Sequence, residues 1–146
     1  MSATSVGVTH TKDAFEGRVW HILGQTYTLK YVSDDMMAWY AVLPPGTFVP
    51  PHVHLTQDES VAVLSGRLDI VHSGGTTAAV AGDYVYLPRN LEHGIYNNSN
   101  EEAHALFHVS PTRKIFDLFE NIHNVGEPAI VVQKAGEREI EFSPPR

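Results

Sequence analysis

The sequence predicts an all-β protein whose strands pair into a two-sheet jelly roll. From Val19 onward, short apolar runs alternate with turn residues, as in a β-sandwich or barrel. The breaks are rich in glycine, proline and asparagine, for example at 44–46, 73–75 and 97–100. Pairing such strands into two packed sheets removes most exposed sheet edges. A helical period replaces this pattern only after Ser110.

The expected strands follow the chain in order, each bounded by turn residues. They are Val19–Leu23, Tyr27–Val32, Ala38–Leu43, Phe48–His54, Ser60–Leu64, Arg67–His72, Thr76–Ala79, Asp83–Leu87, Gly94–Asn97 and Ala103–Val109.

The C-terminal part begins with a short amphipathic helix. Apolar residues at 115, 118, 119 and 122 share one helical face. Ser110 can cap this helix and Pro111 suits its first position, so we expect it over about 111–123. A short strand is expected at Ile130–Gln133. Before the barrel, residues 1–17 have the character of a loose arm with a helical turn at Lys12–Phe15.

Length and composition favour one globular domain over residues 1–146, with the barrel core at about 19–110. A chain of 146 residues with 42% hydrophobic and 10% aromatic residues can bury an ordinary core. Only 18% of the residues are charged, which argues against disorder. With no cysteine, there is no disulfide framework and no thiolate ligand or nucleophile.

Charge and hydropathy bear on the partners and the location. The net charge is −7 and no basic patch stands out, so we expect no nucleic-acid partner, and an anionic membrane surface would repel the protein. No stretch approaches the roughly 20 apolar residues of a membrane span. Residues 1–17 lack an apolar run with a small-residue cleavage site. The expectation is therefore a cytoplasmic protein that acts on a small molecule.

Three histidines and one glutamate form the pattern with the most chemical content. His52 and His54 are two residues apart, so on a strand they point the same way. Glu59 can meet them from the next strand, and His93 from a third. Three imidazoles and a carboxylate make a mixed nitrogen and oxygen ligand set suited to a divalent transition metal.

The spacing around these residues resembles the two motifs of the cupin superfamily. The first cupin motif has fixed positions that match Gly46, His52, His54, Glu59 and Gly66; the second matches Gly82, Pro88, His93 and Asn97. The one departure is Asn90, where the family usually has glycine. Asparagine tolerates positive φ better than most residues, so the turn should survive.

The resemblance implies a double-stranded β-helix, the cupin jelly-roll barrel, with one divalent metal ion held by His52, His54, Glu59 and His93. The ion would be Fe, Mn, Ni, Co, Cu or Zn; the sequence does not choose among them. The alternative is a cupin barrel that keeps its histidines without metal. Cupin barrels usually associate in pairs through their N-terminal strands, which implies a homodimer.

A finer resemblance points to the reaction. Residues 56–66, and the Ser-Pro step before an aromatic-rich helix, are similar to the quercetin-dioxygenase-like group of small cupins. This implies a metal-dependent dioxygenase acting on a small apolar aromatic or enolic oxygenated compound, with Glu59 as ligand and general base. The alternative for Glu59 is a role as metal ligand only. The alternatives are a metal-dependent lyase or isomerase that uses Glu59 as base, and a non-catalytic small-molecule-binding cupin.

Other residues are weaker candidates for the site. His104 and His108 share one face of a predicted strand. If Glu59 is not the base, His108 or a metal-bound hydroxide is the next candidate. Asp58 is offset by one from Glu59 and should face away as a solvated carboxylate. The expected inward residues are Val61, Val63 and Ile95, and the candidates for the pocket mouth are Tyr40, Phe48, Phe107, Phe116 and Phe119.

Overall fold

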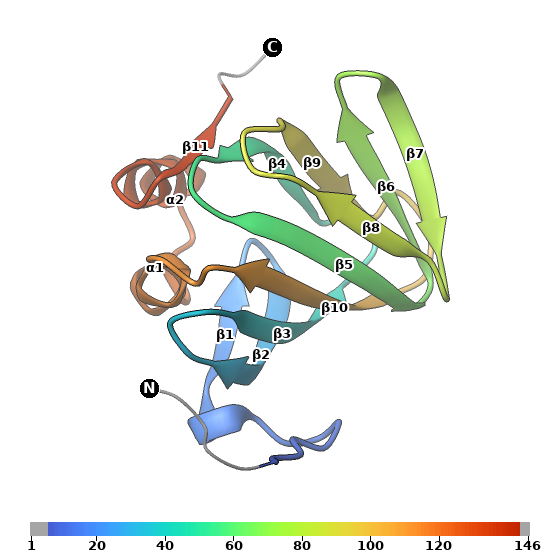
Figure 1. Ribbon diagram of the computed structural model, residues 1–146. Helices are drawn as coiled ribbons and strands as arrows, with labels where there is room; N and C mark the ends of the chain where they lie inside the picture. Colours follow the sequence, from blue (N-terminus) through green and yellow to red (C-terminus); the bar gives the residue numbers. More distant parts are fainter. Residues whose placement is uncertain (1–5, 144–146) are drawn as a thin grey trace.

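A computed structural model describes residues 6–143, which form two antiparallel sheets packed face to face, with two helices against one end (Figure 1). The first half of the chain contains a 3-10 turn η1 (Phe15–Gly17) and the strands β1 (Val19–Ile22), β2 (Gln25–Val32), β3 (Met37–Leu43), β4 (Phe48–His54), β5 (Asp58–Ser65) and β6 (Arg67–His72). The second half contains β7 (Gly75–Val80), β8 (Tyr84–Leu87), β9 (His93–Tyr96), β10 (Ala103–Ser110), α1 (Ile115–Ile122), α2 (Pro128–Gly136) and β11 (Ile140–Phe142).

The strands cross between the two sheets as in a jelly roll. Sheet A has the order β1-β2-β3-β10-β5-β8, and sheet B has the order β11-β4-β9-β6-β7. All ten predicted strands are present, with ends shifted by a few residues. The prediction of an all-β jelly roll with a short C-terminal helix is confirmed.

The core lies between the sheets and extends to α1. Along β3 the burial alternates between buried and half-buried residues, which is the period-two pattern of a strand with one face inward. Trp39 packs within 5.4 Å of the Phe107 ring and within 5.1 Å of the Phe119 ring, between ring centroids. The helix therefore shares the aromatic core of the barrel, and its apolar face contributes Ile115, Leu118, Phe119 and Ile122 as buried residues.

The start of α1 differs from the prediction. Ser110 is the last residue of β10, and α1 begins at Ile115 with Lys114 at the N-cap position and no side-chain cap. Thr112 explains the delay: its amide donates to the Asp34 carbonyl oxygen (3.1 Å) and its hydroxyl donates to the Ser33 carbonyl oxygen. These bonds hold the segment against the β2–β3 connection before the helix can begin.

The expected strand at Ile130–Gln133 is wrong, because these residues lie in helix α2. Pro128 occupies the first turn of this helix, where its missing N–H costs nothing. Val131 and Ala135, four residues apart, are its buried residues. Packing of this face outweighs the strand preference of the β-branched run. The C-terminal strand is instead β11, which pairs with β4.

Two turns have the backbone that the motifs require. Gly66 has φ +78°, and a Cβ there would lie 2.5 Å from the Glu102 carbonyl oxygen; only glycine fits. Asn90 has φ +66°, so asparagine replaces glycine as expected. The backbone N–H of Asn90 donates to the His54 carbonyl oxygen at 2.8 Å, which connects the second motif to the first.

Near the N-terminus, the expected helical turn at Lys12–Phe15 appears slightly later, as η1. No helix of the described residues is long and apolar enough to cross a membrane.

Candidate metal centre

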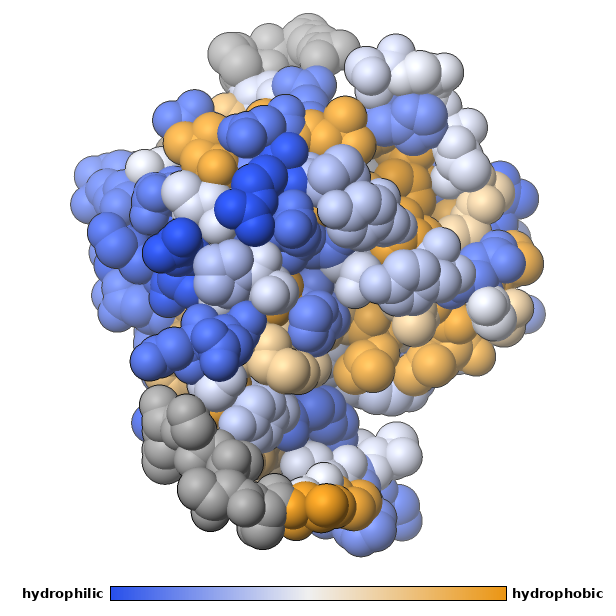
Figure 2. Space-filling view, viewed as in Figure 1, coloured by the Kyte–Doolittle hydropathy of each residue, from blue (hydrophilic) through white to orange (hydrophobic). Residues whose placement is uncertain are grey.

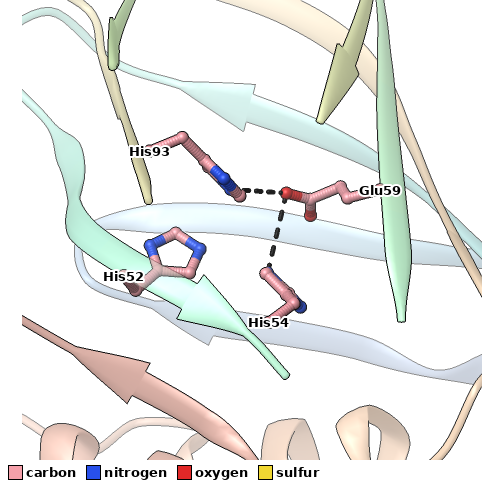
Figure 3. A group of neighbouring side chains, drawn as sticks. All are labelled: His52, His54, Glu59 and His93. Carbon is pink, nitrogen blue, oxygen red and sulfur yellow. Dashed lines mark hydrogen bonds and ion pairs between the residues drawn. The ribbon is translucent and has the colours of Figure 1, made fainter. Parts of the chain in front are cut away.

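Four buried side chains meet between the sheets (Figure 3). His52 and His54 come from β4, Glu59 from β5 and His93 from β9. The register places His93 directly opposite His52 on the neighbouring strand. One ligand atom from each residue lies within 4.8 Å of the others. The structure therefore brings together all four residues that the motifs singled out.

Each imidazole has a hydrogen-bond partner behind it that fixes its orientation. His52 Nδ1 lies 2.7 Å from the Pro50 carbonyl oxygen, and His93 Nδ1 lies 3.1 Å from the Leu91 carbonyl oxygen. A carbonyl oxygen can only accept, so both Nδ1 atoms carry the hydrogen. In a neutral ring this leaves the Nε2 lone pair free to face the centre.

The third imidazole is fixed by a side chain. His54 Nδ1 lies 2.7 Å from Gln57 Oε1. His54 Nε2 is buried and has no hydrogen-bond partner among the described residues; Glu59 Oε1 lies 3.7 Å away. A buried nitrogen without a partner is costly in a folded protein, and a cation between the four side chains would satisfy this one.

The charge states match the requirements of metal ligands. Burial, and after it the neighbouring imidazoles, lowers the pKa of His52 to about 3, so the ring is neutral at pH 7. Burial alone would raise the pKa of the Glu59 carboxyl, but the imidazoles, with His54 foremost, outweigh it and lower the pKa to about 2. An ionised carboxylate therefore lies 3.0 Å from His93 Nε2, with lone pairs converging on one point.

Such a group of acceptors is stable around a cation. Nitrogen and carboxylate oxygen ligands suit zinc and the other divalent first-row metals. The residues therefore fit a metal ion, and the unpartnered His54 Nε2 is the observation that tests this fit. The donor set does not select one metal.

The cluster borders a pocket with almost entirely apolar walls. Besides His52, His54 and Glu59, its wall consists of Ile22, Leu23, Tyr27, Trp39, Val49, Ile95, Phe107, Ile115, Leu118, Phe119, Ile122, Val131, Ile140 and Phe142. No lysine or arginine is among these wall residues.

Tyr27 supplies a phenol to the wall. Burial, followed by the Glu59 charge, raises the pKa of Tyr27, so the phenol stays protonated. Its hydroxyl donates to Gln25 Oε1 at 2.7 Å. The wall thus offers a substrate apolar contacts and almost no charge.

The predicted mouth residues divide into two groups. Phe107 and Phe119 line the pocket, as does Ile95. Phe48 is 44% exposed and stacks on Tyr96, and Tyr40 bonds through its hydroxyl to His104 Nδ1 at 2.7 Å. Neither Phe48 nor Tyr40 is in the wall, because their side chains lie on the faces of β4 and β3 that turn away from it.

Three further candidates behave as ordinary core. Val61 and Val63 are fully buried but do not line the pocket. Phe116 packs edge-on against Trp20, with ring centroids 5.6 Å apart. The two valines point into the core but away from the centre. Phe116 is half-buried and also lies near Arg18, whose guanidinium carbon is 6.0 Å from the ring centroid.

The weaker candidates for site residues, His104, His108 and Asp58, lie outside the site. His104 and His108 are half-buried and alternate with the buried Phe107 on β10, so they occupy the outer face of sheet A. Asp58 also faces away, and its carboxylate bonds to the amide and guanidinium of Arg89. The prediction that Asp58 faces away from the site is confirmed.

Sequence reasoning missed the contribution of the C-terminal segment and of Gln57. Phe142 on β11 lies opposite His52, with ring centroids 5.1 Å apart. Val131 and Ile140 complete the wall from the same segment. Only the tertiary fold reveals these contacts, because about 50 residues or more separate α2 and β11 from the first motif. Gln57 lies inside that motif, but at a position where the motif accepts any residue.

The family comparison agrees with the fold. Residues 39–109, about half of the chain, match the family model described as the cupin domain. A curated relative, "Polyketide synthase CurC" from Streptomyces cyaneus, is 34% identical over 71 residues, which cover 49% of this chain and 46% of that protein. The chain thus spans less than half the length of this relative.

Solved cupins share the architecture. An RmlC-like cupin from Shewanella frigidimarina aligns with a TM-score of 0.66 at 18% identity, covering 77% of this chain and 96% of that one. A sugar phosphate isomerase of the cupin superfamily from Silicibacter pomeroyi aligns with a TM-score of 0.58 at 22% identity, covering 73% and 70%. At these identities the likeness establishes the double-stranded β-helix fold alone.

Proposed function

Since this chain has the cupin fold and carries a cupin domain over residues 39–109, we propose that it is a metal-dependent oxygenase of the quercetin-dioxygenase-like kind. Its substrate would be a small, apolar, aromatic or enolic oxygenated compound. The observation that carries this proposal is the convergence of three imidazoles and a carboxylate at the border of an apolar pocket.

In this proposal His52, His54, Glu59 and His93 hold one divalent ion. Such an ion would supply a Lewis acid toward a substrate oxygen and, where it is redox-active, a route for electrons to dioxygen. In a dioxygenase both atoms of dioxygen end in the products, so the reaction needs no external reductant. An oxygenated ring or a dicarbonyl carbon–carbon bond is cleaved.

The chain's own residues bind the substrate and move its proton. The walls formed by Phe107, Phe119 and Trp39 exclude water and contact a flat apolar ring. Glu59 is ionised and 5% exposed, so its free lone pairs can accept the proton of an enol or hydroxyl placed beside it. Removal of that proton makes the substrate more electron-rich and therefore easier to oxidise.

The substrate class follows from the wall. Phosphorylated sugars need cationic or multiple hydrogen-bonding partners, and no lysine or arginine lines the pocket. The resemblance to a solved sugar phosphate isomerase therefore gives no support for a phosphosugar substrate. The curated relative whose name refers to polyketide synthesis is more compatible, since polyketides are commonly enolic or phenolic.

A second candidate shares the same residues. Glu59 can abstract a proton for a lyase or isomerase reaction without dioxygen, and its ionised state beside the pocket favours this chemistry equally. A third reading, a non-catalytic binding cupin, needs only the pocket and the ion.

One face of the molecule supports the expected homodimer. Of the strand residues of sheet A, only Lys30, Asp58 and Glu59 are lysine, arginine, aspartate or glutamate. Lys30 donates to three carbonyl oxygens of the N-terminal arm, Asp58 bonds to Arg89, and Glu59 points inward. The strands of sheet A therefore place only two charged side chains, Lys30 and Asp58, on its outer face, and both already have hydrogen-bond partners.

The same face is large and apolar enough for a second copy of this chain. Leu106 (36% exposed), Tyr84 (69%) and Tyr86 (60%) are exposed on it, and pale and orange residues gather there in Figure 2. The six strands contain 39 residues in total, and at about 3.4 Å per residue and about 4.8 Å between strands they span roughly 600–700 Å². A stable interface buries about 800 Å² per partner, so the face with its rim suffices.

Metal analysis and oxygen uptake test the enzymatic proposal. Protein purified without added metal should contain about one divalent ion per chain. With flavonols, diketones or polyketide-type enols as candidate substrates, oxygen uptake should stop after chelation and return with the ion. Turnover without oxygen uptake would favour the lyase or isomerase reading, and bound metal without any turnover the binding reading. A protein that takes up no metal under any loading condition contradicts the proposal.

A further inference from the structure

We propose that Gln57 is a positioning residue that orients His54 and connects the metal centre to the helix covering the pocket. The inference rests on the proposed metal site and extends it. Gln57 is 2% exposed and lies in the three-residue connection between β4 and β5. It is neither a motif position nor a wall residue of the pocket.

The hydrogen bonds of Gln57 determine the tautomer of His54. Gln57 Nε2 donates to the Pro111 carbonyl oxygen at 3.0 Å and to the Thr112 carbonyl oxygen at 3.1 Å. Both carbonyl oxygens can only accept, so the positions of the Gln57 side-chain nitrogen and oxygen cannot be exchanged. Gln57 Oε1 must therefore accept the hydrogen of His54 Nδ1 (2.7 Å), which leaves the His54 Nε2 lone pair facing the centre.

His54 differs in this respect from the other two imidazoles. His52 and His93 are held by carbonyl oxygens two residues earlier in the chain, so their orientation is set locally. His54 is held by a side chain whose own anchors lie 54 and 55 residues further along. Its orientation therefore depends on where the segment after β10 lies.

That segment leads into the helix that covers the pocket. The amide of Ile115, the first residue of α1, donates to the Thr112 carbonyl oxygen at 3.4 Å. Ile115, Leu118 and Phe119 then line the pocket from α1. Figure 1 shows the β4–β5 and β10–α1 connections on the same, helix-bearing side of the barrel. A ligand pressed against α1 and an ion on His54 thus share Gln57 as a common support.

The shared support predicts a coupling between ion and helix. An ion that holds His54 fixes Gln57 and, through it, the 111–112 carbonyl groups. Binding of the ion should therefore protect the start of α1 from opening, and an ordered α1 should in turn favour the ion, since such coupling is reciprocal. Gln57 has two separable roles, one through its oxygen and one through its nitrogen.

Two substitutions separate these roles, and a third serves as a matched control. Gln57→Leu removes the acceptor and the donor. Gln57→Glu keeps an acceptor for His54 Nδ1–H but loses both bonds to the carbonyl oxygens. In Asn97→Leu, the chain loses another buried amide that bridges two carbonyl oxygens, those of Leu43 and Glu101, each at 2.8 Å. Co²⁺ alone is the probe; its affinity, its visible absorption spectrum and hydrogen exchange of residues 112–122 are measured.

In the wild type, Co²⁺ should slow exchange over residues 112–122. Gln57→Leu should weaken Co²⁺ binding about 10–100-fold, the usual cost of losing a partner behind a ligand, and should alter the spectrum. Gln57→Glu should bind Co²⁺ with near wild-type affinity while the ion no longer slows exchange in 112–122. Asn97→Leu should lower the thermal midpoint but leave the affinity and the spectrum unchanged.

Several results would overturn the inference. The positioning role is wrong if Gln57→Leu keeps the wild-type affinity and spectrum, or if Asn97→Leu loses as much affinity. The coupling between ion and helix is wrong if Gln57→Glu retains the ion-dependent protection of residues 112–122. If Gln57→Leu does not fold, Gln57→Glu alone tests this coupling. If the wild type binds no Co²⁺, the proposed metal site itself is wrong. If the wild type and Gln57→Leu bind Co²⁺ equally, only the inference about Gln57 is wrong.

Discussion

His52 and His54 show how a single strand can supply half of the candidate metal centre. Side chains two apart leave the same face, and the strand that carries them is paired on both sides, with β9 and with β11. The ring of His52 is 4% exposed, and so is that of His54. Both rings therefore lie in the interior, where the other two side chains of the cluster meet them.

The first prediction concerns these two ligands. The double variant His52→Ala/His54→Ala should lose nearly all metal, because two of four ligands disappear. Metal content after dialysis against a defined ion measures this directly. His104→Ala/His108→Ala, which removes two imidazoles from the outer face of sheet A, is the matched control and should keep the ion. Stoichiometric metal in the first variant would contradict the site.

The second prediction separates the two roles of Glu59. Glu59→Gln keeps an oxygen ligand but loses the proton acceptor. Metal should be retained at least in part, while turnover falls about 100-fold or more, the usual span for a positioned general base. Metal analysis and steady-state kinetics on the same preparation test this. If the variant binds metal and substrate normally and turns over at the wild-type rate, the base lies elsewhere.

At the level of elements, helix α1 is part of the core and of the pocket wall together. Leu118 and Phe119 are buried and line the pocket, and Arg138 after α2 bonds to Asp117 on α1 at 2.7 Å. The two helices and β11 thus close one end of the barrel as a connected unit. Damage to this unit should affect the stability of the protein.

The third prediction tests whether α1 belongs to the core. Phe119 is 6% exposed and packs against Trp20, Tyr27 and Trp39. Phe119→Ser should lower the free energy of unfolding by about 3 kcal/mol or more, since a buried aromatic ring is lost. Urea denaturation measures the change. Phe48→Ser, at a ring that is 44% exposed, is the control and should cost clearly less. A small effect of Phe119→Ser on stability, metal and ligand binding would mean that the helix is a free appendage.

At the scale of the whole molecule, charge is distributed unevenly. The chain carries a net charge of −7, yet the strands of sheet A contribute only the three charged residues already assigned to internal bonds or to the site. Two acidic chains repel each other in most orientations. Contact through the outer face of sheet A keeps most of their charges apart.

The fourth prediction is that this face forms the homodimer. The wild type should sediment as a dimer at tens of micromolar. Leu106→Glu should be a monomer with its metal content intact, because a two-fold axis brings like charges together. Val132→Glu, at a residue of α2 that is 41% exposed, is the control and should remain a dimer. A monomeric wild type, or a dimer that Leu106→Glu leaves intact, would show that the face does not serve this purpose.

Much of the architecture could be predicted from the sequence, because its signals are local. Short apolar runs and turn residues located the ten strands of the barrel, and the motif spacing identified the four residues that meet at the centre. The requirement for positive φ was likewise visible at Asn90, whose φ is +66°. Each of these features depends on side-chain direction or backbone preference over a few residues.

What only the tertiary structure decided depends on contacts between distant segments. Residues 130–133 have the composition of a strand, but packing of Val131 and Ala135 makes them helical. Ser110 suits a helix cap, but pairing with β5 keeps it in β10. Helix α1 covers a pocket whose other walls come from distant segments. The hydrogen bonds from Gln57 to the carbonyl oxygens of residues 111 and 112 likewise join segments more than 50 residues apart. Local preferences differ by about 1 kcal/mol or less per residue, whereas burial of a single large side chain is worth more, so the packed fold determines these segments.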